Sequence, residues 1–442
     1  MNFKTEKNNS KNGETFIPKK FLFVSFESLS GDLAWQVKKE GNEVKIFISS
    51  QDDKDVYDGF FDKVDDWEKY LDWADVIVFD DIGFGDIADS LRNKGKLVVG
   101  GSKYTDKLEE DRKFGQNEME RVGMLILPHW DFVDFDSAIN FIKENPGRYV
   151  FKPSGSTSSD QKGILFLGQD DNGLDLIEIL NQNKKTWAKK IKKLQLQKMA
   201  VGVEVAVGAF FNGQDFIFPV NINFEHKKLF PGDIGPYTGE MGTLAFWSPP
   251  NQIFNNTLLK IKDDLAKSGY VGYIDINCIA NAKGIYPLEF TSRFGYPTIS
   301  VHIEGVTERW GEFLFKIAKK ETVEIKTKRG FQIGVVVAVP PFPYDDKKES
   351  FIYKDLSIIF KKPNLEGVHL GDVKLIKDVW AIAGESGYAL VITGAGSTVE
   401  EARKQVYSRL KNILIQNMYY RTDIGLKWFS DSDRLQTWGY LY

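Results

Sequence analysis

The stretch FLFVSFESLSGDLAWQVKKEGNEVKIFIS (residues 21–49) decides the fold of the first part of the chain. Its first six residues are a short apolar run that suits a buried strand. Residues 27–41 read as a loop and an amphipathic helix that stops at Gly41, and VKIFIS (44–49) reads as a second strand. A strand, a helix and another strand in this order indicate a parallel sheet. The stretch therefore predicts an α/β domain.

The same pattern recurs further along the chain. DVIVFD (75–80), a helix around DIADSLRNKG (86–95) and KLVVGG (96–101) again give strand, helix and strand. We therefore expect an N-terminal, doubly wound α/β domain over residues 19–102. Residues 1–18 are polar and lack the apolar core of a signal peptide, so we expect a disordered lead-in.

The overall composition limits the class of protein. A chain of 442 residues is too long for one core, so about two to four domains are expected. With 58 basic and 62 acidic residues, it is not expected to carry a dominant nucleic-acid surface. Cys278 is the only cysteine, which excludes an intramolecular disulfide, and no apolar run approaches the roughly 18 residues of a membrane helix. We expect a cytoplasmic protein, a monomer or a dimer, without membrane or nucleic-acid partners.

The pattern changes from Lys103 onward. It predicts a charged helix ending at Gly123, a strand–loop–strand unit over 148–168, and long antiparallel strands joined by turns near Gly213 and at NAKG (281–284). The predicted domains after residue 102 are a core over 103–326, made of subdomains 103–200 and 201–326, a small C-terminal α/β domain over 327–427, and an aromatic tail over 428–442.

Lys152 lies inside an apolar strand, YVFKP, which is costly for a charged group unless an anion is near. The loop after it, PSGSTSSDQKGI, offers amides and hydroxyls that suit a phosphate. It does not have the spacing of a P-loop. A surface hairpin with a lysine that reaches solvent is the alternative.

Asp275 and Glu289 lie on two strands that flank the predicted turn near Gly284. Antiparallel pairing can bring both carboxylates to one face, where they would hold Mg²⁺ against nucleotide phosphates. Because side chains alternate along a strand, Thr291 and Arg293 share the face of Glu289. A pair of solvated carboxylates at the rim of the sheet explains the pattern equally well.

GDIGPYTGEMGT (232–243) is rich in glycine, and we expect no strand or helix there. On composition alone a mobile surface loop is favoured over an anion-binding segment.

Taken together, these segments resemble the ATP-grasp ligases, and among them the glycinamide ribonucleotide synthetase (phosphoribosylamine–glycine ligase) family. GDIGPYTGEMGT is similar to the family's D-x-GPNTGGMG, and PLEFTSRFG (287–295) to its EFNxRFGDPE. EHKK (225–228), KLEEDRKFGQNEMERVG (107–123), AGSTVEEAR (395–403) and YRTDIG (420–425) match further family segments in the same order. The resemblance extends from about residue 20 to 427 and implies an ATP-grasp core between an N-terminal (preATP-grasp) and a C-terminal α/β domain.

The resemblance implies that ATP converts a carboxylate into an acyl phosphate, which an amine then attacks to form an amide. ATP and Mg²⁺ (or Mn²⁺) are the implied cofactors, and an amino acid and an amine, possibly phosphorylated, are the implied substrates. It assigns the nucleotide to Arg112, Lys152, Ser156, Lys162, Gly163, Gln197, Lys198, Met199, Ala200 and Glu204. It assigns the metal to Asp275, Glu289 and Thr291. Catalysis is assigned to Arg293 and to the backbone amides of Gly239 and Gly242. Substrate contacts are assigned to Ser28, Ser30, Gly31, His226, Lys227, Asp233, Thr238, Glu240, Met241 and Gly295.

The chain departs from the family pattern at several positions. Thr291 replaces the metal-binding asparagine, YPT (296–298) replaces DPE, and Glu240 replaces a glycine. The N-terminal phosphate loop, G-x-G-x-REH, is absent; Ser28, Ser30 and Gly31 could offer donors to an anion at a helix N-terminus, although Asp32 would oppose one. Two rivals to phosphoribosylamine–glycine ligation therefore remain: a ligase that uses another amine, and a nucleotide-binding relative without turnover.

Overall fold

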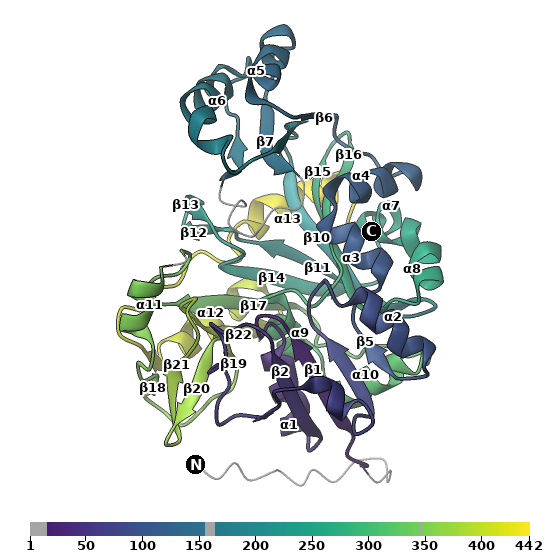
Figure 1. Ribbon diagram of the computed structural model, residues 1–442, viewed down its shortest axis with the longest axis vertical. Coiled ribbons are helices and arrows are strands. Elements are labelled where there is room, and N and C mark those ends of the chain that lie inside the picture. Colours follow the sequence, from purple (N-terminus) through teal and green to yellow (C-terminus); the bar gives the residue numbers. More distant parts are fainter. Residues whose placement is uncertain (1–15, 155–163, 345) are drawn as a thin grey trace.

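The computed structural model describes residues 16–154, 164–344 and 346–442. The N-terminal part is a five-stranded parallel sheet in the order β3-β2-β1-β4-β5 (Figure 1). Its strands are β1 (Lys20–Ser25), β2 (Glu43–Ile48), β3 (Asp62–Lys63), β4 (Val76–Phe79) and β5 (Val98–Val99). Helices α1 (Gly31–Lys39) and α2 (Gly85–Asn93) connect them. The predicted doubly wound sheet is confirmed, while the predicted lead-in falls almost wholly outside the described residues.

The charged segment before Gly123 is not one helix, as predicted, but two. Helix α3 (Lys103–Glu110) ends at Asp111, whose extended backbone (φ −98°, ψ 92°) interrupts the helical hydrogen bonds. The carboxylate of Asp111 then accepts a hydrogen bond from Phe114 N and caps α4 (Arg112–Arg121). This break places Arg112 at the first position of α4.

The next part is a four-stranded antiparallel sheet that projects from the rest of the molecule (Figure 1). It contains β6 (His129–Phe132), β9 (Lys193–Lys198), β7 (Tyr149–Ser154) and β8 (Phe166–Leu167), in that order. Helices α5 (Phe135–Glu144) and α6 (Leu174–Trp187) accompany these strands and close a separate hydrophobic core around Phe135, Phe151 and Leu180.

The centre of the molecule is an eight-stranded antiparallel sheet in the order β16-β15-β10-β11-β14-β17-β22-β19. Its first five strands along this order are β16 (Gly284–Thr291), β15 (Val271–Asn281), β10 (Val203–Asn212), β11 (Phe216–Glu225) and β14 (Gly242–Ser248). The turns near Gly213 and at 281–284 are where we predicted them. Helices α7 (Gln252–Asn256), α8 (Lys262–Ser268), α9 (Thr298–Gly305) and α10 (Trp310–Ala318) connect or flank these strands.

The C-terminal strands extend the central sheet. Strand β17 (Phe331–Ala338) pairs with β14, and β22 (Tyr388–Gly396) and β19 (Val368–Leu370) continue outward from it. The remaining elements are α11 (Lys347–Tyr353), β18 (Ile359–Phe360), β20 (Val373–Ile376), β21 (Val379–Ile382), α12 (Val399–Leu410) and β23 (Ile413–Leu414). Thr398 and Glu401 form a capping box at the start of α12.

The glycine-rich stretch is more regular than we predicted. Ile234–Tyr237 is strand β13, which pairs with β12 (Lys228–Phe230), and Gly242 begins β14. Asp233, at φ +57°, and Gly232, at φ +74°, allow the tight turn between β12 and β13. The prediction that this stretch holds no strand is therefore wrong.

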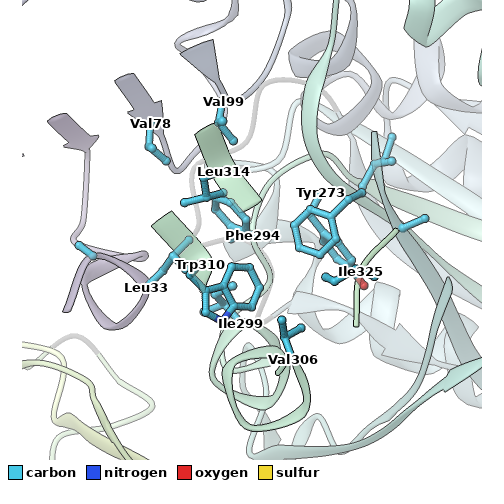
Figure 2. Close-up of a cluster of buried hydrophobic side chains, with 14 of the residues drawn as sticks. Leu33, Val78, Val99, Tyr273, Phe294, Ile299, Val306, Trp310, Leu314 and Ile325 are labelled. Carbon is cyan, nitrogen blue, oxygen red and sulfur yellow. The ribbon is translucent and has the colours of Figure 1, made fainter. Parts of the chain in front are cut away.

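A shared hydrophobic core joins the N-terminal sheet to the central sheet. In Figure 2, Leu33, Val78 and Val99 face Leu314 and Trp310 of α10, while Tyr273 and Phe294 lie on the other side. The carboxylate of Glu40 also accepts hydrogen bonds from Trp310 N and Gly311 N, each 2.9 Å long. These contacts fix α1 and the parallel strands relative to α10 and the central sheet.

The aromatic tail, for which the sequence suggested no role, forms α13 (Trp428–Thr437). The Trp428 ring packs edge-on against Phe224, Phe246 and Phe331. The tail therefore covers the end of the core. Within the described residues, no helix is long and apolar enough to cross a membrane.

Candidate active site

The predicted metal residues share one face of the central sheet. Asp275 of β15 lies directly opposite Thr291 of β16, and Asn277 lies directly opposite Glu289. Residues two apart on a strand point to the same side, so all four side chains belong to one face. The sequence predicted three of the four and missed Asn277.

Lys227 follows β11 and gathers three carboxylates on this face. Its Nζ lies 3.2 Å from Glu225, 3.3 Å from Glu204 and 4.0 Å from Glu289. Burial alone would lower the pKa of Lys227, but these carboxylates outweigh it and hold the pKa well above its usual range. Lys227 is therefore a fixed positive charge among the acids.

Lys152 of β7 brings a second positive charge to the site from the four-stranded sheet. Its Nζ donates to Oε1 of Gln197, 2.7 Å away on β9. Burial, and then the nearby Arg112 and Lys227, lower the pKa of Lys152 to about 7, while Glu289 acts in the opposite direction. Residues Lys152, Arg112, Gln197, Lys227 and Glu289 thus come together, whereas Ser156, Lys162 and Gly163 lie outside the described residues.

The link between the two sheets is held by backbone hydrogen bonds. Lys198 N donates to Pro128 O (2.8 Å) and Met199 N to Arg148 O (3.0 Å). The Lys198 ammonium lies 4.7 Å from the centroid of the Tyr149 ring. Ala200 continues this link, and Glu204 in β10 then reaches Lys227.

Arg293 is clamped between two parts of the chain. Its Nε lies 3.0 Å from Glu109 Oε1 in α3 and 3.1 Å from Asp81 Oδ1 just after β4. Glu109 also accepts a hydrogen bond from Ser292 N (2.7 Å). Burial would lower the pKa of Arg293, but Glu109, Asp81 and Asp275 raise it instead. Gly295, two residues on, accepts a hydrogen bond from Ile299 N (2.8 Å) near the start of α9.

Much of the glycine-rich stretch is engaged within the chain itself. Asp233 pairs with Arg421 (3.0 Å) and Lys427 (2.7 Å), and Thr238 donates to Lys227 O through both its N–H and its hydroxyl. Met241 N donates to His226 O (2.8 Å), so this amide is not available to a substrate. The substrate contact that we assigned to Met241 is therefore not made by its backbone amide.

The two predicted catalytic glycines have different surroundings. Gly239 is exposed, and a Cβ there would meet no atom within 4 Å. A Cβ at Gly242 would lie 2.5 Å from Gly334 O, so this glycine allows β14 to approach β17 closely. His226, just before Lys227, is buried, and burial lowers its pKa to about 3, so it stays neutral.

The side chain of Glu240, which replaces a glycine of the family pattern, is turned inward. It is buried, and its pKa is raised well above the usual range, first by burial and then by Glu225 and Asp275, while Lys227 opposes the rise. Glu240 is therefore a further member of the carboxylate group around Lys227, not an exposed acid.

The start of α1 holds a carboxylate of the chain itself. Ser30 donates to Asp80 Oδ2 through both its N–H (2.8 Å) and its hydroxyl (2.9 Å). Burial, and then Asp81, raise the pKa of Asp80 to about 7. Gly31 is required by packing, because a Cβ there would lie 2.0 Å from the Tyr57 ring, whose hydroxyl donates to Ser28 O. The donors that we assigned to a substrate anion at Ser30 are thus already used.

The oxygen atoms on the shared face fit a hard cation. Among the described residues, no three His, Cys, Asp or Glu side chains form a group that could hold a metal ion by themselves. Mg²⁺, however, needs only one or two carboxylates when phosphates complete its shell. Glu289 and Asp275 supply carboxylates, and Asp275 Oδ1 and Asn277 Oδ1 are buried without a hydrogen-bond partner in the described residues.

Comparison with known proteins assigns this arrangement to a family. The family model "Phosphoribosylglycinamide synthetase, ATP-grasp (A) domain" matches residues 110–299, and the model of the C domain of the same synthetase matches 332–427. The chain belongs to the phosphoribosylglycinamide synthetase family. The predicted ATP-grasp architecture is thereby confirmed.

Individual relatives of this family cover almost the whole chain. The phosphoribosylamine–glycine ligase of Streptococcus pneumoniae is 25% identical over 427 residues, which are 92% of this chain and 99% of that protein. The crystal structure of the phosphoribosylamine–glycine ligase of Thermotoga maritima has a TM-score of 0.69 at 21% identity and covers 92% of this chain and 100% of that one. A biotin carboxylase–nucleotide complex from Campylobacter jejuni shares the fold, with a TM-score of 0.61 at 15% identity, over 95% and 96% of the two chains.

The sequence missed four residues of the candidate site: Asp81, Glu109, Glu225 and Asn277. A signal existed for Asp81, because it follows a predicted parallel strand at its carboxyl end, where ligands bind in such sheets. Asn277 also had a signal, because it lies two residues after Asp275 on the same strand. Glu109 had none, since its partner Arg293 is 184 positions away.

Proposed function

We propose that this protein is an ADP-forming ligase that joins a carboxylate to an amine through an acyl phosphate. The observation that carries the proposal is the geometry at the junction of the two sheets. Lys227 Nζ lies 4.0 Å from Glu289, and Lys152, which donates to Gln197, is influenced by the charges of Arg112 and Glu289. Positive charges beside a carboxylate suit the binding and transfer of a nucleotide's terminal phosphoryl group. Membership of the family and the names of its relatives support the same reaction.

In the first step, a carboxylate oxygen of the substrate attacks the γ-phosphorus of ATP, and ADP leaves. Lys152 binds the phosphates from the four-stranded sheet and Arg112 binds them from the start of α4, while Lys227 neutralises charge from the central sheet. Mg²⁺, or Mn²⁺, held by Glu289 and Asp275 would neutralise further charge on the transferred group. Lys198 to Ala200 border the base, and Glu204 accepts hydrogen bonds from the ribose hydroxyls.

In the second step, the amine attacks the acyl carbon, phosphate leaves with its bond electrons, and the amine loses a proton as the amide forms. No side-chain nucleophile is required, because the acyl phosphate already carries the leaving group. Arg293, held by Glu109 and Asp81, binds the reacting carboxylate.

Glycine and phosphoribosylamine are the first substrate pair to consider, since the relatives are named for this pair, and the reaction would belong to purine biosynthesis in the cytoplasm. A different amine is the second candidate. The specific observation in its favour concerns Asp80, which accepts hydrogen bonds from both the N–H and the hydroxyl of Ser30 at the start of α1. A carboxyl group therefore occupies the position where the phosphate of phosphoribosylamine would need positive charge.

The test is an assay with the purified full chain, ATP, Mg²⁺, glycine and freshly generated phosphoribosylamine. The proposal expects ADP and phosphate only when both co-substrates are present. Turnover with glycine and other amines, but not with phosphoribosylamine, would select the second candidate. Nucleotide binding without turnover on any amine would instead identify a non-catalytic relative.

A variant tests the phosphoryl-transfer site directly. Glu289→Ala removes an exposed side chain at the end of β16 and should abolish metal-dependent turnover without loss of folded protein. Unchanged turnover would place the metal elsewhere.

A further inference from the structure

We infer that Asn277 supplies the amide oxygen of the metal site, in place of the residue at 291, where the family has asparagine and this chain has threonine. The inference rests on the proposed function, since it concerns the metal that accompanies ATP. It assigns a residue that the family pattern does not indicate.

The register of the sheet places Asn277 where such a ligand is needed. Asn277 is the residue of β15 directly opposite Glu289, and Asp275 is directly opposite Thr291. Side chains directly opposite each other in an antiparallel pair have Cβ atoms about 4.5–5.5 Å apart, which lets both reach one ion. The Asn277 side chain is therefore a neighbour of Glu289 on the adjacent strand. An asparagine at 291 would be a neighbour of Glu289 on the same strand, so either amide could share an ion with Glu289.

The orientation of the Asn277 amide is set by Glu225. Asn277 Nδ2 donates to Glu225 Oε1 at 3.4 Å. An ionised carboxylate only accepts hydrogen bonds, so the NH₂ group must face Glu225 and the oxygen must face away from it. Glu225 is itself fixed by Lys227 at 3.2 Å, which gives the amide a rigid support.

The burial of the Asn277 side-chain oxygen also indicates a ligand, independently of the strand register. Asn277 is 5% exposed, and its Oδ1 is buried without a hydrogen-bond partner among the described residues. A buried acceptor without a partner is costly, and a hard cation is a partner that the oxygen-rich face can accommodate. Thr291 offers only a hydroxyl, which is a weaker oxygen ligand.

The test measures metal binding and not turnover. Full-length protein is saturated with ADP and titrated with Mn²⁺, and free Mn²⁺ is followed by electron paramagnetic resonance. Asn277→Ala is expected to weaken Mn²⁺ binding about 10- to 100-fold. Adding Thr291→Asn to that variant is expected to recover most of the loss, because it restores an amide oxygen on the same face.

The matched control is Asn281→Ala, which removes an asparagine on the same face at the far end of β15. It should leave Mn²⁺ binding unchanged, and melting temperatures of all variants report on folding. Unchanged binding in Asn277→Ala, or a loss that Thr291→Asn does not recover, would overturn the inference. If the unaltered protein with ADP bound no Mn²⁺, the proposed function would fail first, and this inference with it.

Discussion

The carboxylate of Asp32, in the first turn of α1, lies 2.8 Å from Nδ1 of His369 in β19. It also accepts hydrogen bonds from Ser300 Oγ in α9 (2.9 Å) and from Leu370 N (3.2 Å). His369 Nε2 continues the network to Thr393, 2.8 Å away in β22. The N-terminal sheet, α9 and the C-terminal strands are thus joined by one buried carboxylate, and Asp32 does not face a ligand at the start of α1.

Asp32→Asn should therefore destabilise the protein. Burial would raise the pKa of Asp32, but His369 outweighs it and the pKa is lowered. A lowered pKa means that the stabilising contribution is present above the carboxyl group's usual pKa and is lost as the pH falls through the folded-state value. We expect a loss of about 1–3 kcal/mol in the free energy of unfolding at pH 7.

Urea denaturation at pH 7 and at pH 3 measures this loss, and the difference between variant and unaltered protein should shrink at pH 3. Asp433→Asn, at an exposed position on α13, is the control. Equal loss at both pH values would show that the Asp32 charge contributes nothing.

The pKa of Lys152 predicts how nucleotide binding depends on pH. In the free protein its pKa is about 7, because burial and then Arg112 oppose the charge. Anionic phosphates favour the charged amine, so binding at pH 8 should take up a proton, and affinity should fall as the pH rises above 7. The expected fall is up to about tenfold per pH unit.

Isothermal titration with ADP in buffers of different ionisation enthalpy measures the proton uptake. Lys152→Arg keeps a positive charge at all these pH values and should remove the uptake while it retains binding. Uptake that persists in Lys152→Arg would have to come from another group.

The position of Arg293 predicts that Arg293→Lys, inside the site, lowers kcat, whereas Arg329→Lys, outside it, does not. The Nε of Arg293 lies 3.0 Å from Glu109 and 3.1 Å from Asp81, so the rigid, planar guanidinium has a fixed orientation that a flexible lysine side chain does not reproduce. Arg293→Lys should lower kcat at least tenfold, while the affinity for ADP changes little. Arg329→Lys, outside the site, should leave both unchanged, and a loss of ADP affinity equal to the loss of kcat would assign Arg293 to the nucleotide instead.

Most of the fold could be predicted from the spacing of hydrophobic residues along the chain. The β1–α1–β2 unit, the turns near Gly213 and at 281–284, and the shared face of Asp275 and Glu289 follow from periods of two and 3.6 residues. These features depend on residues close in sequence, so the sequence can predict them.

The features that the sequence missed depend on distant partners or on local backbone chemistry. Strand β17 joins β14 and not a separate C-terminal sheet, and Glu109 meets Arg293, because packing brings these segments together. The break at Asp111 and the β12–β13 turn depend on a cap and on positive φ values at Gly232 and Asp233. Composition alone suggested a continuous helix and an open loop there.

Glu240 predicts a change in stability that grows with pH. Its pKa is raised well above the usual range by burial and by Glu225, so the folded protein holds a proton that the unfolded chain releases above about pH 4.5. Stability is then lost as the pH rises, because the folded state binds more protons than the unfolded state.

Glu240→Gln removes this penalty while it keeps the size of the side chain. The variant should equal the unaltered protein in stability near pH 4 and exceed it at pH 8 by at least about 1 kcal/mol, the equivalent of one pKa unit. Thermal unfolding at both pH values measures the difference, with Glu400→Gln on the exposed side of α12 as the control. If the stability difference between Glu240→Gln and the unaltered protein were the same at pH 4 and pH 8, the pKa of Glu240 would not be raised in the folded protein. The acid that replaces the family's glycine would then not make stability depend on pH.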